Sequence, residues 1–140
     1  MSYHYTIHPA DNVVVVTASG RVVGEEVIAS VEAMARDPRF VAGMHQLCDY
    51  REIQGIAITL AEIKHLAHLE KRDYDKIKDG KLAMVTGSFD VSSLCVLYAT
   101  LIRLRGRQAK VFRSIDEAYA WLGLPEAPVM EARAEAEHAG

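Results

Sequence analysis

The chain has 140 residues, which is the length of a single domain. Half of the residues are apolar and a quarter are charged, so the composition excludes disordered, collagen-like and low-complexity classes for most of the chain. The formal net charge of −3 belongs to residues 125–140, where four acids face one base, so the neutral remainder has no global field that would attract nucleic acid or acidic membranes.

The first two predicted elements are strands that form a hairpin. Residues 3–8 alternate between apolar and polar side chains, as expected for a strand with one solvent-exposed face. Residues 9–12 are typical of a turn, and the β-branched run Val13–Val16 predicts a strand that is covered on both faces. The short turn makes these two strands antiparallel neighbours.

A helix and a third strand follow the hairpin. Apolar side chains between residues 27 and 35 recur at helical spacing, and Asp37-Pro38 ends this helix. Residues 44–50 predict the third strand, which leads into a connection over residues 51–58.

A second helix and two strand–helix units complete the predicted domain. The second helix begins with a capping box formed by Thr59 and Glu62, and the last helix begins with the same pattern at Ser114 and Glu117. Gly123 ends the last helix. The remaining predicted elements are strands at 81–86 and 109–112 and a helix at about 91–105.

This order, ββαβαβαβα, predicts an α/β fold with a mixed, mostly parallel sheet of about five strands and helices packed on it. We expect residues 1–123 to form one domain. Residues 124–140 are rich in Ala and Glu and are expected to form an exposed helix or a tail.

The sequence favours a cytoplasmic protein without an integral membrane segment. No apolar run approaches the roughly 20 residues that a transmembrane helix needs. The N-terminus lacks the basic start and apolar segment of a signal peptide. Cys48 and Cys95 have no metal-ligand spacing, and we expect both to be buried, reduced thiols.

Three segments resemble the STAS-like group, named after sulfate transporters and anti-sigma-factor antagonists. They are the strand end Leu47–Tyr50, the helix start at Thr59 and Glu62, and the stretch Lys110–Leu122, which is similar to the group's last strand, cap and aromatic helix. The resemblance spans about residues 3–123 and lies closest to small stand-alone bacterial members, which are distantly similar to lipid-carrying CRAL-TRIO domains.

The resemblance to anti-sigma-factor antagonists implies a phosphorylation site after the third strand. In those proteins a serine of an Asp-Ser-Ser-Gly motif is phosphorylated by a partner kinase. The corresponding residues 55–59 contain neither serine, and Thr59 is the hydroxyl nearest to that position. A phosphoryl group there would gain from the helix N-terminus, but the capping box favours Thr59 as a structural N-cap.

Polar side chains at two strand ends are the candidate binding residues. Asp49, Tyr50 and Arg51 follow the third strand, and Ser88 and Asp90 follow the fourth. Open α/β sheets bind ligands in crevices at the carboxyl ends of their strands. For Ser88 or Asp90, an N-cap of the next helix is the favoured alternative.

We expect no catalytic residues, metal, cofactor or nucleic-acid partner. The sequence has no nucleophile elbow, Walker loop or dinucleotide-binding glycine motif. Glu62, His65 and His68 are spread around a helix in a way that favours a solvated face over a metal site. The basic stretch 103–113 is explained by a helix C-terminus and lacks the interleaved aromatics expected for nucleic-acid binding.

The helix predicted at 91–105 has a wider apolar surface than a core-facing helix needs. The line of side chains expected to face the sheet is Val91, Cys95, Tyr98 and Ile102. The adjacent line is Leu94, Leu97, Leu101 and Leu104. This second line needs a neighbouring helix, a second subunit or an apolar ligand to cover it.

These features favour a non-enzymatic STAS-like module that regulates or binds protein partners and acts as a homodimer. The alternative, implied by the CRAL-TRIO likeness, is a carrier or sensor of a small apolar or amphipathic, lipid-like ligand. An elongated apolar cavity between the 91–105 helix and the sheet would favour the ligand. A filled core would favour an interface or a neighbouring helix.

Overall fold

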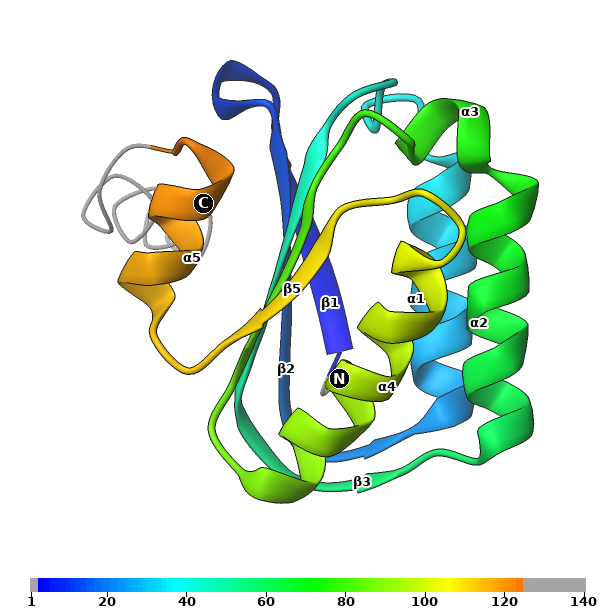
Figure 1. Cartoon of the computed structure of the whole chain (residues 1–140), viewed down its shortest axis with the longest axis vertical. Helices are drawn as coiled ribbons and strands as arrows, with labels where there is room; N and C mark the ends of the chain where they lie inside the picture. Colours follow the sequence, from blue (N-terminus) through cyan, green and yellow to red (C-terminus); the bar gives the residue numbers. More distant parts are fainter. Residues whose placement is uncertain (1–2, 125–140) are drawn as a thin grey trace.

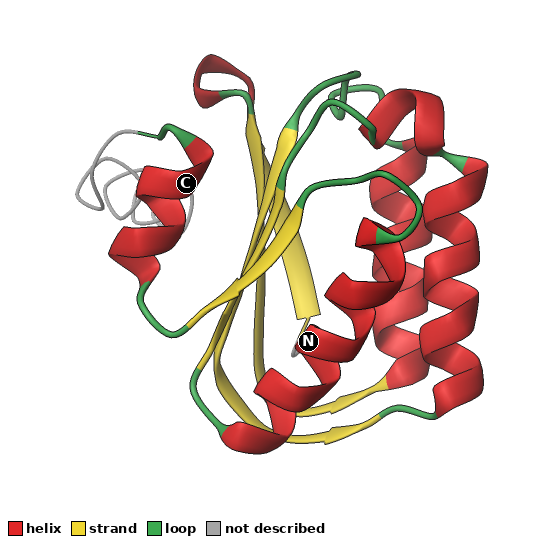
Figure 2. Ribbon diagram, viewed as in Figure 1, coloured by secondary structure: helices red, strands yellow, loops and turns green. Residues whose placement is uncertain are grey.

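Residues 3–124, the part described by the computed structural model, form a five-stranded sheet with helices on both faces (Figures 1 and 2). The strands are β1 (Tyr3–His8), β2 (Val13–Val23), β3 (His45–Ala57), β4 (Leu82–Thr86) and β5 (Ala109–Phe112). The helices are α1 (Gly24–Arg36), α2 (Leu60–Arg72), α3 (Tyr74–Ile77), α4 (Phe89–Arg103) and α5 (Ile115–Leu122). A 3-10 turn, Pro9–Asp11, joins β1 to β2.

The strands lie in the order β1-β2-β3-β4-β5, with β1 antiparallel to β2 and all other neighbours parallel. Crossovers between parallel strands are right-handed, so three crossovers that advance in one direction place α1, α2 and α4 on the same face. Figure 1 shows these helices on one side of the sheet and α5 on the other. The predicted fold class and element order are confirmed, with the short α3 added between α2 and β4.

Two strands are longer than the sequence predicts. β2 continues beyond Val16 to Val23, and β3 continues beyond Tyr50 through the segment expected to be a connection. The two extensions pair with each other in parallel, and Val23 lies opposite Ala57 at the end of the ladder. The ladder shifts register near Gly20, whose φ of +69° suits glycine. Gly20, which looks like the end of a strand in the sequence, therefore lies within β2 at an irregularity of its pairing with β3.

Helix α2 lies in a layer outside the other long helices of its face. α1 contacts β1 and β2, and α4 contacts β3, β4 and β5, whereas α2 contacts α1, α3 and α4. In Figure 1, α2 is correspondingly farther from the sheet. The space between α1 and α4 is therefore bounded by the sheet on one side and by α2 on the other.

The buried apolar side chains form two clusters, one on each face of the sheet. The larger cluster lies beneath α1, α2 and α4, and the smaller cluster lies beneath α5. Alternation along β4 shows the division, because Leu82 and Met84 belong to the larger cluster and Ala83 and Val85 to the smaller one. A central parallel strand must be apolar on both faces, and β4 meets that requirement.

Residues 125–140 lie outside the described part of the chain, so the predicted C-terminal helix or tail stays a prediction. Between residues 3 and 124, no helix has the length and apolar character needed to cross a membrane.

Candidate functional site

An apolar cavity of about 110 Å³ lies between the sheet and helices α1, α2 and α4. Val16, Cys48 and Met84 line it from the strands, and Leu66 and Leu94 line it from the helices. Such walls offer a ligand dispersion contacts and burial of apolar surface. A cavity in this place is the feature that favours an apolar ligand over a filled core.

The bent ends of β2 and β3 contribute to the wall of the cavity. Val22 of β2 and Ile53 and Ile56 of β3 contribute to its lining. In Figure 1, both strands curl toward the helices at this end. These residues belong to the strand extensions that the sequence did not predict, so a sheet that ended at Tyr50 would lack this part of the wall.

The tyrosines Tyr3 and Tyr50 and the thiols of Cys48 and Cys95 line the cavity and carry no charge at neutral pH. The hydroxyls of Tyr3 and Tyr50 share a hydrogen bond of 2.8 Å, and burial raises the pKa of both phenols. Burial also raises the pKa of the Cys48 thiol to about 11 and that of Cys95 to about 12. These groups are therefore weak nucleophiles at neutral pH and act as neutral hydrogen-bonding side chains.

A second polar group is centred on Arg107, whose side chain is 1% exposed. The guanidinium donates to both carboxylate oxygens of Glu70, at 2.8 and 2.9 Å, to the carbonyl of Gly80 at 3.2 Å, and to Oε1 of Gln46. The Tyr98 hydroxyl donates to Glu70 Oε1 at 3.0 Å. Because Gln46, Glu70 and Tyr98 line the cavity, this network forms a polar end to it.

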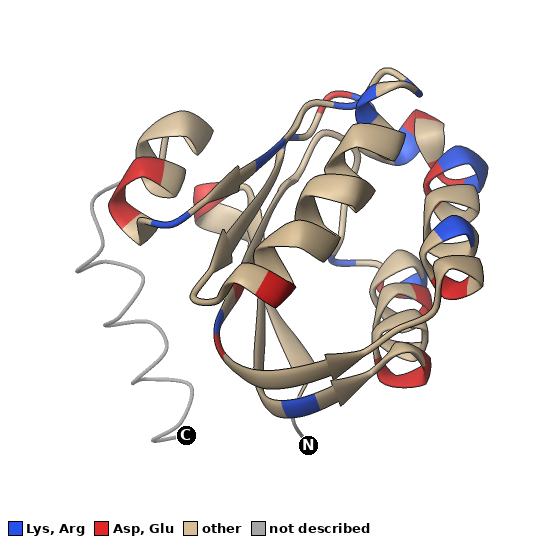
Figure 3. Cartoon of the chain, turned by 60° about the horizontal axis from the view of Figure 1, so that its bottom comes forward, with Lys and Arg blue, Asp and Glu red and all other residues tan. Residues whose placement is uncertain are grey.

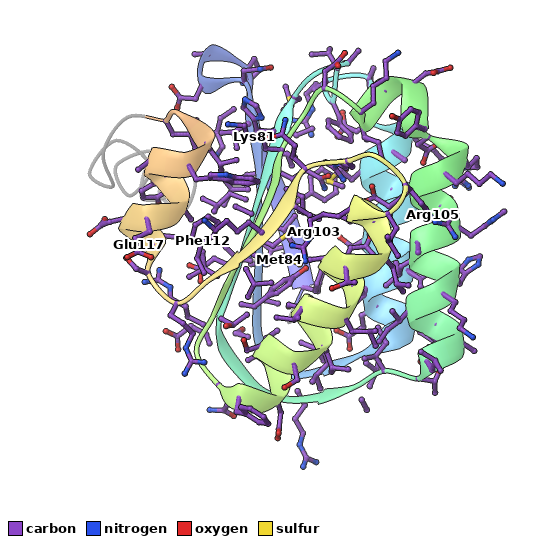
Figure 4. All side chains as sticks on the ribbon, in the orientation of Figure 1. Lys81, Met84, Arg103, Arg105, Phe112 and Glu117 are labelled. Carbon is purple, nitrogen blue, oxygen red and sulfur yellow. The ribbon has the colours of Figure 1, made fainter. Side chains whose placement is uncertain are left out.

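Sequence reasoning missed this network. Arg107 belongs to the basic stretch that was assigned to a helix C-terminus, and no spacing in the sequence links it to Glu70. Two neighbouring arginines also contact other elements: Arg103, in the last turn of α4, donates to the carbonyl of Ala109 in β5 at 2.9 Å, and Arg105 donates to that of Ala67 in α2 at 3.0 Å. Figure 4 shows both arginines at the end of α4. The stretch therefore joins elements of the fold.

The candidate residues at the end of the third predicted strand point to different faces of β3. Arg51 and Asp49 form an ion pair at 2.8 Å, whereas Tyr50 between them bonds to Tyr3 in the cavity wall. Side chains alternate along a strand, so these three residues do not form the single polar group that was expected. Of the three, Tyr50 lines the cavity.

Ser88, Asp90 and Thr59 lie at helix starts outside the lining of the cavity. Ser88 Oγ accepts from the backbone N–H of Val91 and caps α4, and Asp90 is exposed in the first turn. Thr59 caps α2 through the predicted box: Oγ1 accepts from the Glu62 N–H at 3.1 Å, and the Glu62 carboxylate accepts from the Thr59 N–H at 2.9 Å. Their roles in binding or phosphorylation stay predictions.

The apolar surface of α4 is divided between the cavity, the core and solvent. The helix begins and ends two residues earlier than predicted. Leu94 lines the cavity and Leu101 packs against the larger core cluster. Leu97 is 39% exposed, and Leu104, directly after the helix, is 80% exposed. Figure 3 shows few charges on α4, and the apolar side chains of Val96 and Leu97 are exposed on it.

Within the described residues, the histidines and cysteines do not form a metal centre. His65 and His68 are exposed on α2, and the Glu62 carboxylate is engaged in the capping box. Across residues 3–124, no group of three metal-ligating side chains converges. Cys48 and Cys95 are buried free thiols, as predicted.

Comparison with known proteins defines the fold. No protein-family model matches the sequence, and no curated protein matches it either. A solved structure that does match is an uncharacterized protein of the DUF3478 family with a SpoIIAA-like fold from Shewanella loihica PV-4, with a TM-score of 0.54 and 14% identity. The match covers 86% of this chain and 91% of that chain. This chain therefore has a SpoIIAA-like, that is STAS-like, α/β fold, as the resemblance implied.

Proposed function

We propose that the protein is a non-enzymatic binding module that holds a small apolar or amphipathic ligand in the cavity beneath α1, α2 and α4. The cavity itself carries this proposal, because burial of apolar atoms in a preformed apolar space is favourable without further rearrangement. The SpoIIAA-like fold is compatible with a non-enzymatic regulatory module, and bound ligand would be the signal or the cargo.

The volume limits what the cavity holds. An engineered apolar cavity of about 150 Å³ stays dry and binds benzene or xenon. A cavity of about 110 Å³ is therefore suited to a small ligand, or a ligand segment, of up to about six non-hydrogen atoms. The protonated state of the thiols and phenols in its wall supports binding over nucleophilic catalysis.

The first test asks whether the full-length protein binds apolar molecules inside the cavity. Native mass spectrometry of freshly purified protein should detect a co-purified ligand, and NMR titration with benzene should shift signals of cavity residues such as Met84. Leu94→Trp should fill the space and abolish both effects. Leu97→Trp is the matched control, because Leu97 is on the same helix and is partly exposed.

Retained benzene binding in Leu94→Trp, with the same residues shifted, would show that the molecule binds elsewhere. Absence of a co-purified ligand together with absence of benzene shifts in the unmodified protein would overturn the proposal.

A second candidate function, pairing through the outer surface of α4, rests on a different observation. Phe89 and Leu104 are 78% and 80% exposed, and Val96 and Leu97 are partly exposed between them. Exposed apolar side chains of this kind are typical of an interaction surface. We propose that they join two copies of the chain, or the chain and a protein partner, in the cytoplasm.

Light scattering should then show a dimer, and Leu104→Glu should yield monomers. A monomeric unmodified protein with no partner recovered would contradict this candidate.

A further inference from the structure

The carboxamide of Gln46 brings an underused hydrogen-bond donor to the polar end of the cavity. The residue is 6% exposed and lies on β3 in the cavity wall. Across residues 3–124, the partner of its Nε2 is the Met34 sulfur at 3.5 Å. An amide nitrogen carries two protons, and a thioether is a weak acceptor, so Nε2 has hydrogen-bonding capacity left.

The orientation of this amide follows from its neighbour. Arg107 has donors and no acceptor, so the Gln46 atom that meets the guanidinium must be the carbonyl oxygen. Arg107 is fixed in turn by Glu70 and by the Gly80 carbonyl. The amide nitrogen of Gln46 is thereby held on the side away from the guanidinium, next to Met34.

The charges around Gln46 favour a neutral ligand group. Arg107 and Glu70 are paired with each other, and Glu70 is among the residues that line the cavity, so an anionic ligand would meet a like charge there. Lys76 also lines the cavity, but its Nζ donates to the carbonyl of Ala35 at 3.1 Å and lies 4.9 Å from the centre of the Phe40 ring.

We propose, resting on the proposed function above, that the ligand has an apolar chain and a neutral acceptor oxygen, a carbonyl or a hydroxyl. The oxygen accepts from Gln46 Nε2, and the chain extends along the aliphatic walls of the cavity. Without such an oxygen, burial of the Gln46 Nε2 donor costs free energy, and the weak contact with the Met34 sulfur offsets that cost only in part.

The test compares three probes that share one carbon chain length: 2-pentanone, n-pentane and pentanoate. Dissociation constants come from NMR titration of the full-length protein and of Gln46→Glu. This substitution keeps an oxygen for Arg107 and removes the amide donor. We expect 2-pentanone to bind about fivefold more weakly to the variant, as for one lost hydrogen bond, while n-pentane affinity changes little. In the unmodified protein, pentanoate should bind more weakly than 2-pentanone.

Two further variants keep the test decisive. Met34→Leu preserves volume and removes the competing sulfur, so 2-pentanone should bind equally well or more tightly. If Gln46→Glu does not fold, Gln46→Met supplies the same comparison of ketone with alkane.

The outcomes separate this inference from the proposed function. If n-pentane binds, and Gln46→Glu changes the affinities of n-pentane and 2-pentanone equally or changes neither, Gln46 does not hold the ligand oxygen. That result would overturn the role of Gln46 and leave the cavity function standing. Tighter binding of pentanoate than of 2-pentanone would overturn the neutral-oxygen assignment. Failure of all three probes to bind a protein that still binds benzene would overturn this inference alone, whereas absence of benzene binding and of a co-purified ligand as well would overturn both proposals.

Discussion

Arg107 and Glu70 show how much the fold depends on single side chains. Transfer of a guanidinium and a carboxylate from water is unfavourable, and here their mutual attraction and three further hydrogen-bonding groups, from Tyr98, Gly80 and Gln46, offset it. The same contacts join α2 to the segment that precedes β5 and to the start of β4. The pair therefore holds Glu70 in place in the cavity wall.

Removal of the arginine should be strongly destabilising. Arg107→Ala would leave the Glu70 carboxylate largely buried without its cation, and we expect the free energy of unfolding to fall by about 3–5 kcal/mol. Arg36→Ala is the matched control, because the Arg36 side chain is 79% exposed in its pair with Glu32 and its loss should change stability by about 0.5 kcal/mol or less. Urea denaturation measures both. Similar small effects in the two variants would contradict a structural role for the buried pair.

The buried thiols predict that stability falls in alkaline solution. The pKa of Cys48 is raised from 9.0 to about 11 and that of Cys95 to about 12, so the unfolded chain releases these protons at lower pH than the folded chain. Their contribution is fully present below pH 9 and is lost as the pH rises through 11 and 12, by up to about 1.4 kcal/mol per pH unit for each group.

Urea titrations at pH 8 and at about pH 10 measure this decline, and Cys95→Ala should make it shallower. The raised pKa values of Tyr3 and Tyr50 act in the same direction at higher pH. A free energy of unfolding that does not change over this range would refute the prediction.

At the scale of elements, helix starts follow local rules and strand lengths do not. The box at Thr59 and Glu62 forms as its spacing predicts, and Ser114 caps α5 by accepting from the Glu117 N–H. The extensions of β2 and β3 have no such local signal, because each is a strand only while the other pairs with it. Gly55 and Gly20 look like breaks in the sequence, and pairing overrides them.

The cap of α2 gives a direct test at this scale. Thr59→Ala removes the side-chain acceptor for the Glu62 N–H, and we expect a loss of about 1 kcal/mol in the free energy of unfolding. Thr59→Ser keeps the hydroxyl and should be nearly neutral. Equal stability of the two variants would show that the box contributes little. The phosphorylation hypothesis is separate, and incubation with a kinase followed by mass spectrometry of this residue tests it.

At the scale of the whole molecule, the parallel strands begin where distant segments converge. Met44 precedes β3, Gly80 precedes β4 and Arg107 precedes β5; Gly80 lies against the backbone of Met44, and its carbonyl accepts from Arg107. A methyl group on Gly80 would clash with the backbone carbonyl of Met44. The approach of these two segments thus requires glycine.

Gly80→Ala should therefore separate the starts of β3 and β4, with a loss of about 1–3 kcal/mol in the free energy of unfolding. Gly55→Ala is the control, because the nearest side-chain atoms would lie at 3.8 Å, an ordinary contact distance. Thermal unfolding of both variants measures the difference. If the Gly80 variant is as stable as the Gly55 variant, the close approach tolerates a side chain.

The sequence by itself determined the features that depend on neighbours along the chain. Strand alternation, helical spacing and capping boxes are local, and together with the right-handed crossover rule they specify the α/β class and the order of elements. The burial of Cys48 and Cys95 follows from the same patterns.

Only the tertiary structure decided where the chain leaves space and which distant groups meet. The cavity exists because α2 lies outside α1 and α4 and because the paired extensions of β2 and β3 contribute to its wall. Tyr50 forms a hydrogen bond with Tyr3, and Arg107 with Glu70 and Gln46. These partners are far apart in the sequence, and no local pattern links them. Packing and pairing between remote segments are collective, so the shape and polarity of this site arise only when the whole domain has folded.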